Sequence, residues 1–453
     1  MSQYAVSARD ASTPARRGRS PALSSLPIVI AISVLALGLR LAAVRFVGPD
    51  PGITTWSESG TVAGNLIDGK GFTFDFYGLR PDRPLRSFVP PLYVALIYAC
   101  LRWAAQPALA LALVQAVLST LICGAIYGIA LSLSGKKMVA TLAALASACY
   151  PVLILQVITP QSMILHAALL LWAVAVTLLL PEWPHPGWTA LAGILWGLIA
   201  LGRPTLLGFM PLVVWWLWLN RSTWRQWLQT SVLLAIVVIL VVLPWTARNY
   251  RIHGQLVLIS TNGGVTFWNG NNPFTTGSGH FLYTEKLDQF VGRPHDPTLP
   301  AIIQLAPYPM TPEIQARVAT VAEVTLDRQL YQAGLDFIRQ HPRDWLALVR
   351  QKLVSFWWFR PGLGSAYEAS WTRYYKLMYA PLLVLFAAGL VMSLRHSRRY
   401  GLLYLLFAYH TVTNVAYNVV TRYRWEIEPL FLIFVALSVS AAADRLFSGR
   451  RHA

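Results

Sequence analysis

The chain has 453 residues, of which 55% are hydrophobic and only 12% are charged, and its mean hydropathy is +0.49. No soluble protein of this size buries so much apolar side chain, so the composition predicts a polytopic membrane protein. The net charge of +18 does not indicate a nucleic-acid partner, because Lys and Arg lie mostly at segment ends and in loops, as the positive-inside rule expects. The three cysteines lie in apolar stretches without metal or disulfide spacing and are best interpreted as small core residues.

A tail rich in Ser, Ala and Arg, residues 1–25, is predicted to be disordered and cytoplasmic. The first span, Leu26–Val47, is expected to be retained, because it is long for a signal peptide and no small-residue cleavage site follows it. The later apolar segments are 89–103, 107–133, 138–155, 160–180, 188–202, 204–219, 227–246, 376–394, 400–420 and 429–446.

Segment 89–103 decides the predicted topology. It is short, opens with Pro90-Pro91 and ends in Arg102-Trp103, which is typical of a helix lying in the membrane interface. If it does not cross, the basic clusters of the short links all fall on the cytoplasmic side: Lys136, Lys137, Arg221, Arg225, Arg395, Arg398, Arg399, Arg445, Arg450 and Arg451.

The sequence therefore predicts an all-α fold with about ten transmembrane helices, both termini in the cytoplasm, and large exterior loops that carry interfacial helices. The predicted units are the tail 1–25, a transmembrane module 26–247 that includes the exterior loop 48–106, an exterior region 248–375, C-terminal transmembrane helices 376–446 and a cytoplasmic tail 447–453.

The stretch from Pro244 to Gly277 turns abruptly from apolar to polar. The long apolar run Trp227–Leu243 ends there in Pro244-Trp245, and the β-branched run Leu256–Ile259 predicts a short strand. Residues 262–273 are rich in Gly and Asn, which tolerate left-handed backbone, so tight turns are the favoured interpretation.

A second interpretation of the same stretch stays open, because amide side chains such as Asn271 and Asn272 suit sugar hydroxyls. Beyond it, residues 278–310 predict irregular loop. A helix is then expected from Thr311-Pro312 to Gln340, and an interfacial helix from Arg343 to Phe359.

Two acids in the first exterior loop are candidates for proton transfer. Glu58 opens a helical stretch and shares a face with Val62 and Leu66, so it is either a partner of the helix dipole or a buried base. The dipole interpretation is favoured on residue chemistry alone. Asp50 lies in a Gly-Pro-Asp-Pro-Gly turn that turn chemistry already explains.

Arginines near the predicted outer surface are candidates for phosphate binding, because a guanidinium grips phosphate in two-pronged fashion. Arg248 and Arg251 follow the apolar segment 227–246. Arg203, Arg422 and Arg424 fall in short exterior links, where arginine is costly or snorkels to the interface. A local ion-pair cluster with Glu426 and Glu428 is the structural alternative for the last two.

The order of several short motifs resembles glycosyltransferase family 39 of the GT-C superfamily, which includes protein O-mannosyltransferases and the lipid A aminoarabinose transferase. The resemblance covers most of residues 26–446. The motifs are Glu58, Ala63…Asn65-Leu66…Gly69-Lys70-Gly71-Phe72, Pro90-Pro91-Leu92-Tyr93, Gly202-Arg203-Pro204, Pro244-Trp245…Arg248-Asn249-Tyr250, Gly270-Asn271-Asn272-Pro273…Gly277, Lys352-Leu353…Phe356-Trp357 and Arg422-Tyr423-Arg424…Pro429.

The resemblance implies a plasma (inner) membrane glycosyltransferase that works on the exterior face with a sugar linked to a polyprenyl phosphate. The family's loop-one carboxylate is commonly an Asp, often followed by Glu, whereas this chain has Ser57-Glu58 and keeps Asp50 as a second candidate. The substrate-binding set it implies is Arg248, Arg251, Arg422, Arg424, Arg203, Tyr93, Asn271 and Asn272.

No cofactor and no metal motif is expected, and the acceptor is open between protein, lipid and glycan. Membrane lipid is an expected partner and nucleic acid is not. The first alternative is a flippase or transporter of lipid-linked sugars, which should carry polar or broken helices at the membrane midplane. The second is an enzyme of the O-antigen polymerase or ligase type, against which the loop-one carboxylate and the Pro90-Pro91 helix speak.

Overall fold

A computed structural model describes residues 25–55, 57–221, 223–273, 275, 312–359 and 369–449. Two predicted segments therefore lie outside the described residues: the disordered tail, except Ser25, and the irregular loop 278–310. The described residues form helices and no strand, with one isolated antiparallel bridge between Phe74 and Leu85.

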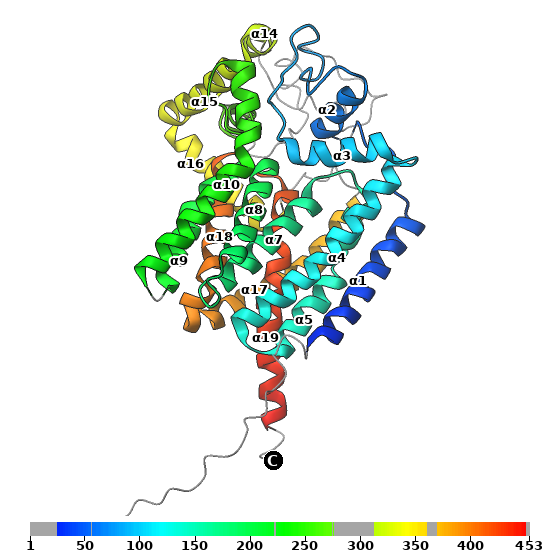
Figure 1. Cartoon of the computed structure of the whole chain (residues 1–453), viewed down its shortest axis with the longest axis vertical. Coiled ribbons are helices and arrows are strands. Elements are labelled where there is room, and N and C mark those ends of the chain that lie inside the picture. The colour runs from blue at the N-terminus through cyan, green and yellow to red at the C-terminus, as the bar shows by residue number, and fades with distance from the viewer. Residues whose placement is uncertain are drawn as a thin grey trace, which may run out of the picture.

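A bundle of apolar helices makes up most of the molecule (Figure 1). Among the described residues, five stretches are long and apolar enough to cross a membrane, or six if the bent pair α5–α6 is one span, and four shorter apolar helices accompany them. The chain is thus a multi-pass membrane protein, while the count of ten spans stays a prediction. The bundle contains α1 (Leu26–Phe46), α4 (Pro107–Ser134), α5 (Lys137–Ala148), α6 (Pro151–Leu155), α7 (Met163–Leu179), α8 (Pro186–Gly202), α9 (Met210–Asn220), α10 (Trp224–His253), α17 (Ala369–Ser393), α18 (Ser397–Ala416) and α19 (Glu428–Gly449).

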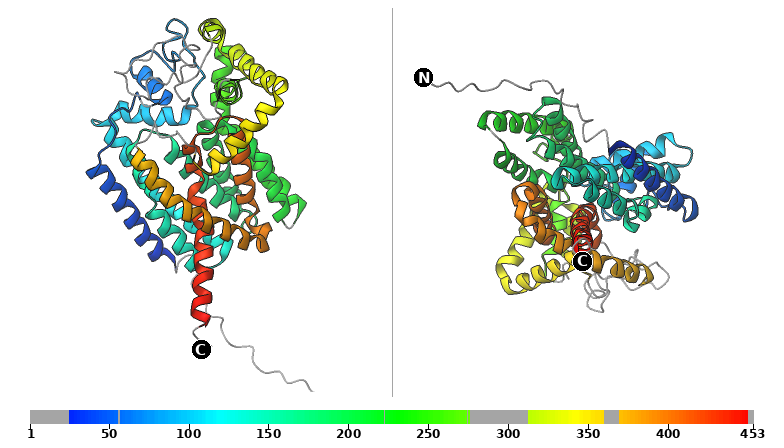
Figure 2. Two further views of the ribbon diagram at one scale, coloured as in Figure 1. Left: turned by 180° about the vertical axis from the view of Figure 1, so that it is seen from behind. Right: turned by 90° about the horizontal axis from the view of Figure 1, so that it is seen from below.

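Shorter helices form a cap at one end of this bundle (Figures 1 and 2). Helix α3 lies across the end of the bundle, the orientation expected of a helix in the membrane interface. The start of α1 and the end of α19 lie at the opposite end, away from the cap. The cap helices are α2 (Glu58–Ile67), α3 (Pro91–Trp103), α11 (Gly263–Gly270), α14 (Pro312–Thr320), α15 (Glu323–Gln340) and α16 (Pro342–Trp357).

Arg40 is fully buried inside the bundle, on α1. Its Nε donates to Ser119 Oγ at 2.7 Å, and its terminal nitrogens donate to the carbonyls of Ser147 and Ala148 at 3.3 and 2.9 Å. Helix α5 ends at Ala148 and is bent by 47° from the segment that follows. Arg40 therefore satisfies carbonyls that the break between α5 and α6 leaves free.

Helix α10 runs to His253, well past the apolar run that ends at Leu243. The helix continues through Pro244 because side chains of its last turns bind the segment that follows. Thr246 Oγ1 donates to Leu258 O at 2.7 Å, and Asn249 Nδ2 donates to the carbonyls of Val257 and Ile259. The carbonyls of residues 257–259 accept these hydrogen bonds, and residues 256–259 form no strand. The prediction of a strand there was wrong.

Residues 263–270 form helix α11 and not the predicted tight turns. The glycines serve close packing instead of left-handed backbone. A Cβ on Gly264 would collide with the backbone of Asp327 on α15, and one on Gly270 would collide with the carbonyl of Tyr417. The predicted helix 311–340 is likewise two helices, α14 and α15, interrupted at 321–322.

Candidate functional site

Glu58 is the first residue of α2 and is half-buried. The preceding Ser57 caps the helix, since its Oγ accepts the backbone N–H of Gly60 at 3.3 Å. Tyr77, nineteen residues later in the same loop, 48–106, donates its hydroxyl to Glu58 Oε1 at 2.6 Å. The carboxylate thus has one oxygen engaged by protein and stands at the positive end of a helix.

Asp50, the second candidate base, closes a turn. Its Oδ1 accepts the backbone N–H of Gly52 at 2.8 Å, and its own N–H donates to Ile158 O at 2.9 Å. These contacts match the turn role that residue chemistry predicts.

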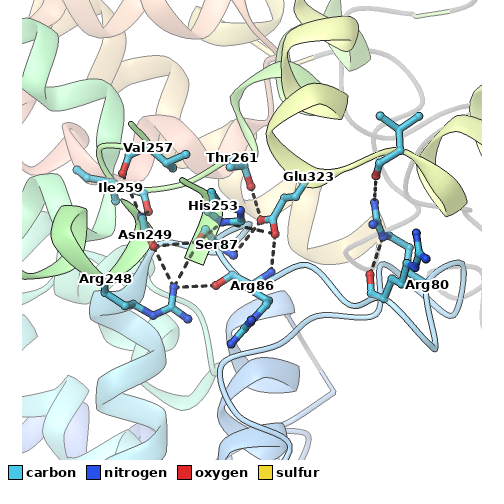
Figure 3. A network of polar contacts seen from close by, with 12 residues as sticks. Arg80, Arg86, Ser87, Arg248, Asn249, His253, Val257, Ile259, Thr261 and Glu323 are labelled. Atoms are coloured by element: carbon cyan, nitrogen blue, oxygen red, sulfur yellow. Dashed lines mark hydrogen bonds and ion pairs between the residues drawn. The ribbon is translucent and has the colours of Figure 1, made fainter. Parts of the chain in front are cut away.

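A polar junction joins loop 48–106 to the ends of α10 and α15 (Figure 3). At its centre is Glu323, the first residue of α15, which is buried. Its carboxylate accepts the backbone N–H groups of Arg86 and Ser87 at 2.7 and 2.8 Å and the hydroxyl of Thr261 at 2.6 Å. We call these residues, together with Arg248, Asn249 and His253, the outer junction.

Arg80 anchors the same loop to α14. Its Nη1 donates to the carbonyls of Val318 and Val321, both at 2.9 Å, where α14 ends. Burial lowers the pKa of Arg80 from its ordinary value. Loop 48–106 is therefore fixed to the end of α14 and to the start of α15.

Arg248 belongs to this junction and keeps donors to spare. Its Nη1 donates to Arg86 O at 2.8 Å and to Asn249 Oδ1 at 2.9 Å. Its guanidinium lies over the rings of Trp245 and Phe72, at 4.4 and 5.0 Å from their centroids. Within the described part of the chain, its Nε and Nη2 make no hydrogen bond, so they remain able to bind an anion.

Arg86 adds a second positive charge beside Arg248. Its side chain is exposed and lies near enough to repel the guanidinium of Arg248 (Figure 3). Two close guanidiniums of this kind favour an anion between or beside them. Arg251, one turn further along α10, is exposed.

Arg203 forms a separate buried cluster with Glu426 and His166. Glu426 is fully buried; its Oε2 lies 3.0 Å from Arg203 Nε, and its Oε1 lies 3.1 Å from His166 Nδ1. Burial raises the pKa of Glu426, but the charge of Arg203 and the hydrogen bond of His166 hold that pKa below its usual value. Arg203 also stacks on Tyr423, as Arg422 does at longer range, 4.8 against 5.9 Å.

Arg424 is fully buried and forms an ion pair with Glu428, as the alternative of a local ion-pair cluster predicted. Its Nε donates to Glu428 Oε1 at 2.6 Å, Nη1 donates to Phe356 O at 2.6 Å, and the guanidinium lies 3.9 Å from the Tyr379 ring centroid. No described contact joins Arg424 to the outer junction. In this arrangement, Arg424 holds α16, α17 and α19 together.

The three remaining predicted contacts are also engaged by protein. Tyr93 is buried, with its hydroxyl 3.4 Å from Gln115 Oε1. Asn271 Nδ2 donates to the carbonyls of Phe267 and Ala416, while Asn272 Nδ2 donates to the carbonyl of Trp268. The amides therefore close the end of α11, which is a structural role.

Three residues that shape this site were not predicted from the sequence: Tyr77, Arg86 and Glu323. Arg86 lies four residues before the Pro90-Pro91 motif, but nothing in the local sequence distinguishes it from the other basic residues of the loop. Glu323 and Tyr77 act across 236 and 19 positions, which no local pattern shows. Lys352 is fully buried, and its Nζ donates to Asn271 Oδ1 at 3.1 Å.

Among the described residues, no group of three or more His, Cys, Asp and Glu side chains is arranged to hold a metal ion. Neither a protein-family model nor a curated protein matches the chain. The structural comparison does give a match, to the Archaeoglobus fulgidus oligosaccharyltransferase, solved as a complex with zinc and sulfate. The TM-score is 0.51 at 15% identity, over 92% of this chain and 49% of that one.

The chain has a GT-C fold. It spans about half the length of the oligosaccharyltransferase, 49%, and at 15% identity the likeness concerns the fold alone. ArnT from Cupriavidus metallidurans, solved with bound undecaprenyl phosphate, also aligns over 93% of this chain and 79% of its own, at 16% identity. Its TM-score of 0.40 is too low to carry an argument.

Proposed function

We propose that this GT-C protein is a glycosyltransferase that moves a sugar from a polyprenyl-phosphate donor to an acceptor hydroxyl, at the exterior face of the plasma membrane. The observation that carries the proposal is that loop 48–106 holds a carboxylate and also binds an arginine of α10. A half-buried carboxylate, Glu58, belongs to the loop itself, and Arg248, with donors to spare, is bound to its backbone. The fold shared with an oligosaccharyltransferase supports it.

In the proposed reaction, Glu58 accepts the proton of the acceptor hydroxyl as that oxygen bonds to the anomeric carbon of the sugar. The bond from the anomeric carbon to the phosphate oxygen breaks, and the phosphate leaves with the electron pair. Arg248, with Arg86 beside it, stabilises the negative charge of the departing lipid phosphate. The remaining predicted arginines, Arg251, Arg203 and Arg422, are proposed to attract the donor from further away.

The placement of the site suits a water-insoluble donor. Loop one and the outer junction lie in the cap, next to α3, which crosses the end of the bundle. We propose that α3 guides the prenyl tail while the phosphate stays at the surface, near Arg248.

The flippase alternative would use a polar or broken helix inside the bundle, and the α5–α6 break beside Arg40 is such a feature. However, all five donors of the Arg40 guanidinium are engaged by protein, at Ser119, Ala36, Ala148, Ser147 and Cys123. This engagement favours a structural role for Arg40 and an enzyme over a transporter.

The test begins with the lipids of a deletion strain, where mass spectrometry identifies the polyprenyl-phosphate sugar that accumulates. That lipid is supplied to the full chain in proteoliposomes, with membranes of the deletion strain as the source of acceptor, and release of polyprenyl phosphate is measured. Glu58→Gln is expected to lower the rate roughly a hundredfold or more while donor binding survives. Near-normal transfer by Glu58→Gln, with Asp50→Asn folded and inactive, would assign the base to Asp50 instead.

A further inference from the structure

Two consecutive aromatic residues of the first exterior loop adopt left-handed backbone. The φ angles are +51° at Phe76 and +59° at Tyr77, and among the described residues these are the only ones other than glycine with positive φ. Bulky side chains rarely occupy this region, and such outliers concentrate at functional sites. Gly78 is the next residue in the chain. The two strained positions before it are nevertheless occupied by bulky aromatic residues and not by glycine, which tolerates positive φ.

The surrounding loop holds this backbone in place. Phe76 is buried, and its ring meets the Phe88 ring edge-on at 5.3 Å, while Phe74 stacks on Phe88 at 5.5 Å. The backbones of Phe74 and Leu85 exchange hydrogen bonds of 2.8 and 2.7 Å across the base of the loop. Burial of Phe76 therefore fixes where the next residue must point.

The Tyr77 side chain is 42% exposed, so the strained backbone does not serve to bury the Tyr77 ring in the core. The Tyr77 hydroxyl instead donates to Glu58 Oε1 at 2.6 Å. The Phe74 ring lies edge-on to the Tyr77 ring, with 5.1 Å between the ring centroids. A hydrogen bond to a charged acceptor is stronger than one between neutral groups, and it restricts the carboxylate to one orientation.

We propose that Tyr77 is a positioning residue for Glu58: it binds Oε1, so that Oε2 is the oxygen that receives the acceptor proton. The inference rests on the proposed function, because it gives Tyr77 a role only if Glu58 is the base. A purely structural role would predict that loss of the hydroxyl changes the stability of the loop and leaves the pH profile of the reaction in place.

The test compares Tyr77→Phe with a matched control, Tyr404→Phe. Tyr404, on α18, also makes a hydroxyl hydrogen bond of 2.6 Å, to Ser393 at the end of α17. Both variants keep the ring, so both are expected to fold, which thermal melting checks. The substrate is the accumulated lipid identified above, and kcat, KM and the pH profile of kcat/KM are measured on the full chain in proteoliposomes.

Tyr77→Phe is expected to lower kcat roughly tenfold with little change in KM. Because a donated hydrogen bond stabilises the charged carboxylate, its loss should also move the acid limb of the pH profile to higher pH. Tyr404→Phe should behave as wild type. In a Glu58→Gln chain, the additional change Tyr77→Phe should cost nothing further, since the oriented base is already absent.

Replacement of Tyr77 by p-aminophenylalanine, which restores a donor at the same place, should return the acid limb towards its original pH. An unchanged kcat and pH profile in Tyr77→Phe, alongside an inactive Glu58→Gln, overturns this inference and leaves the proposed function standing. If Glu58→Gln is active, Glu58 is not the base, and the role proposed for Tyr77 is then wrong as well.

Discussion

The carboxylate of Glu323 accepts the backbone N–H of Ser87 at 2.8 Å, although 236 residues separate the two. The bond joins the start of α15 to loop 48–106, at the point where Arg248 also reaches the loop backbone. The buried Glu323 carboxylate is therefore one of the contacts that hold loop 48–106 against α15, and Arg248 binds the same loop residues.

Glu323→Gln should destabilise the outer junction. Glutamine keeps one acceptor oxygen but presents an NH2 group to backbone N–H donors, so at least one buried donor loses its partner, at a cost of about 2 kcal/mol. The melting temperature, followed by tryptophan fluorescence, should fall clearly below wild type. Glu182→Gln, at an exposed position between α7 and α8, is the matched control. Equal melting of all three chains would show that the junction contributes little.

Lys352 gives a prediction about pH. Burial lowers the pKa of Lys352 from 10.5 to about 7, and its Nζ has neutral acceptors, Asn271 Oδ1 and the carbonyl of Tyr417. Between those two pKa values the unfolded chain binds more protons than the folded one, so the free energy of unfolding should rise as the pH increases from about 7 towards 10.

The variant Lys352→Met removes this titration. The melting temperature of wild type minus that of Lys352→Met should therefore increase with pH over this range, because only wild type gains stability from deprotonation of a buried lysine. A difference that stays constant with pH would mean that Lys352 remains charged, or solvated, in the folded protein.

The helical bundle was predictable from sequence because it depends on long apolar runs, and Leu26–Phe46 was located to within one residue. The region after α10 was not predictable, because its structure depends on distant partners. Gly264 and Gly270 suggested turns, yet they permit contact with Asp327 and Tyr417. Arg40 lay unnoticed within the first span, since the broken helix that needs its donors is more than a hundred residues away.

The same reason limits the predicted site. The helix start at Glu58 was predictable because it is a local feature, but the hydroxyl of Tyr77 is positioned by a strained backbone that no sequence pattern indicates. The arginines were chosen by charge and predicted topology alone. Charge does not distinguish Arg248, which keeps free donors, from Arg424, which an internal ion pair engages.

The predicted topology is open to labelling. Asp68, in the cap, and Arg395, in the link between α17 and α18, are both exposed. In a chain whose exposed Cys149 is replaced by serine, Asp68→Cys should react with a membrane-impermeant maleimide from outside the bilayer. Arg395→Cys should react only after the membrane is opened. Labelling of Arg395→Cys in sealed, right-side-out membranes would contradict the predicted orientation.

Arg248→Lys tests the proposed binding of the donor phosphate. Lysine keeps the positive charge but replaces the planar fork with a point charge, and it also loses the stacking of the guanidinium on Trp245 and Phe72. Transfer should fall about tenfold or more, through both kcat and donor KM, because phosphate charge is present in the ground state and grows in the transition state. Arg225→Lys, at the other end of the same helix, is the matched control and should transfer at the wild-type rate. The anion itself is tested by thermal unfolding with inorganic phosphate or polyprenyl phosphate. Equal protection of the wild type and of Arg248→Lys would mean that the anion binds elsewhere, and the Arg203 cluster would be the next candidate site.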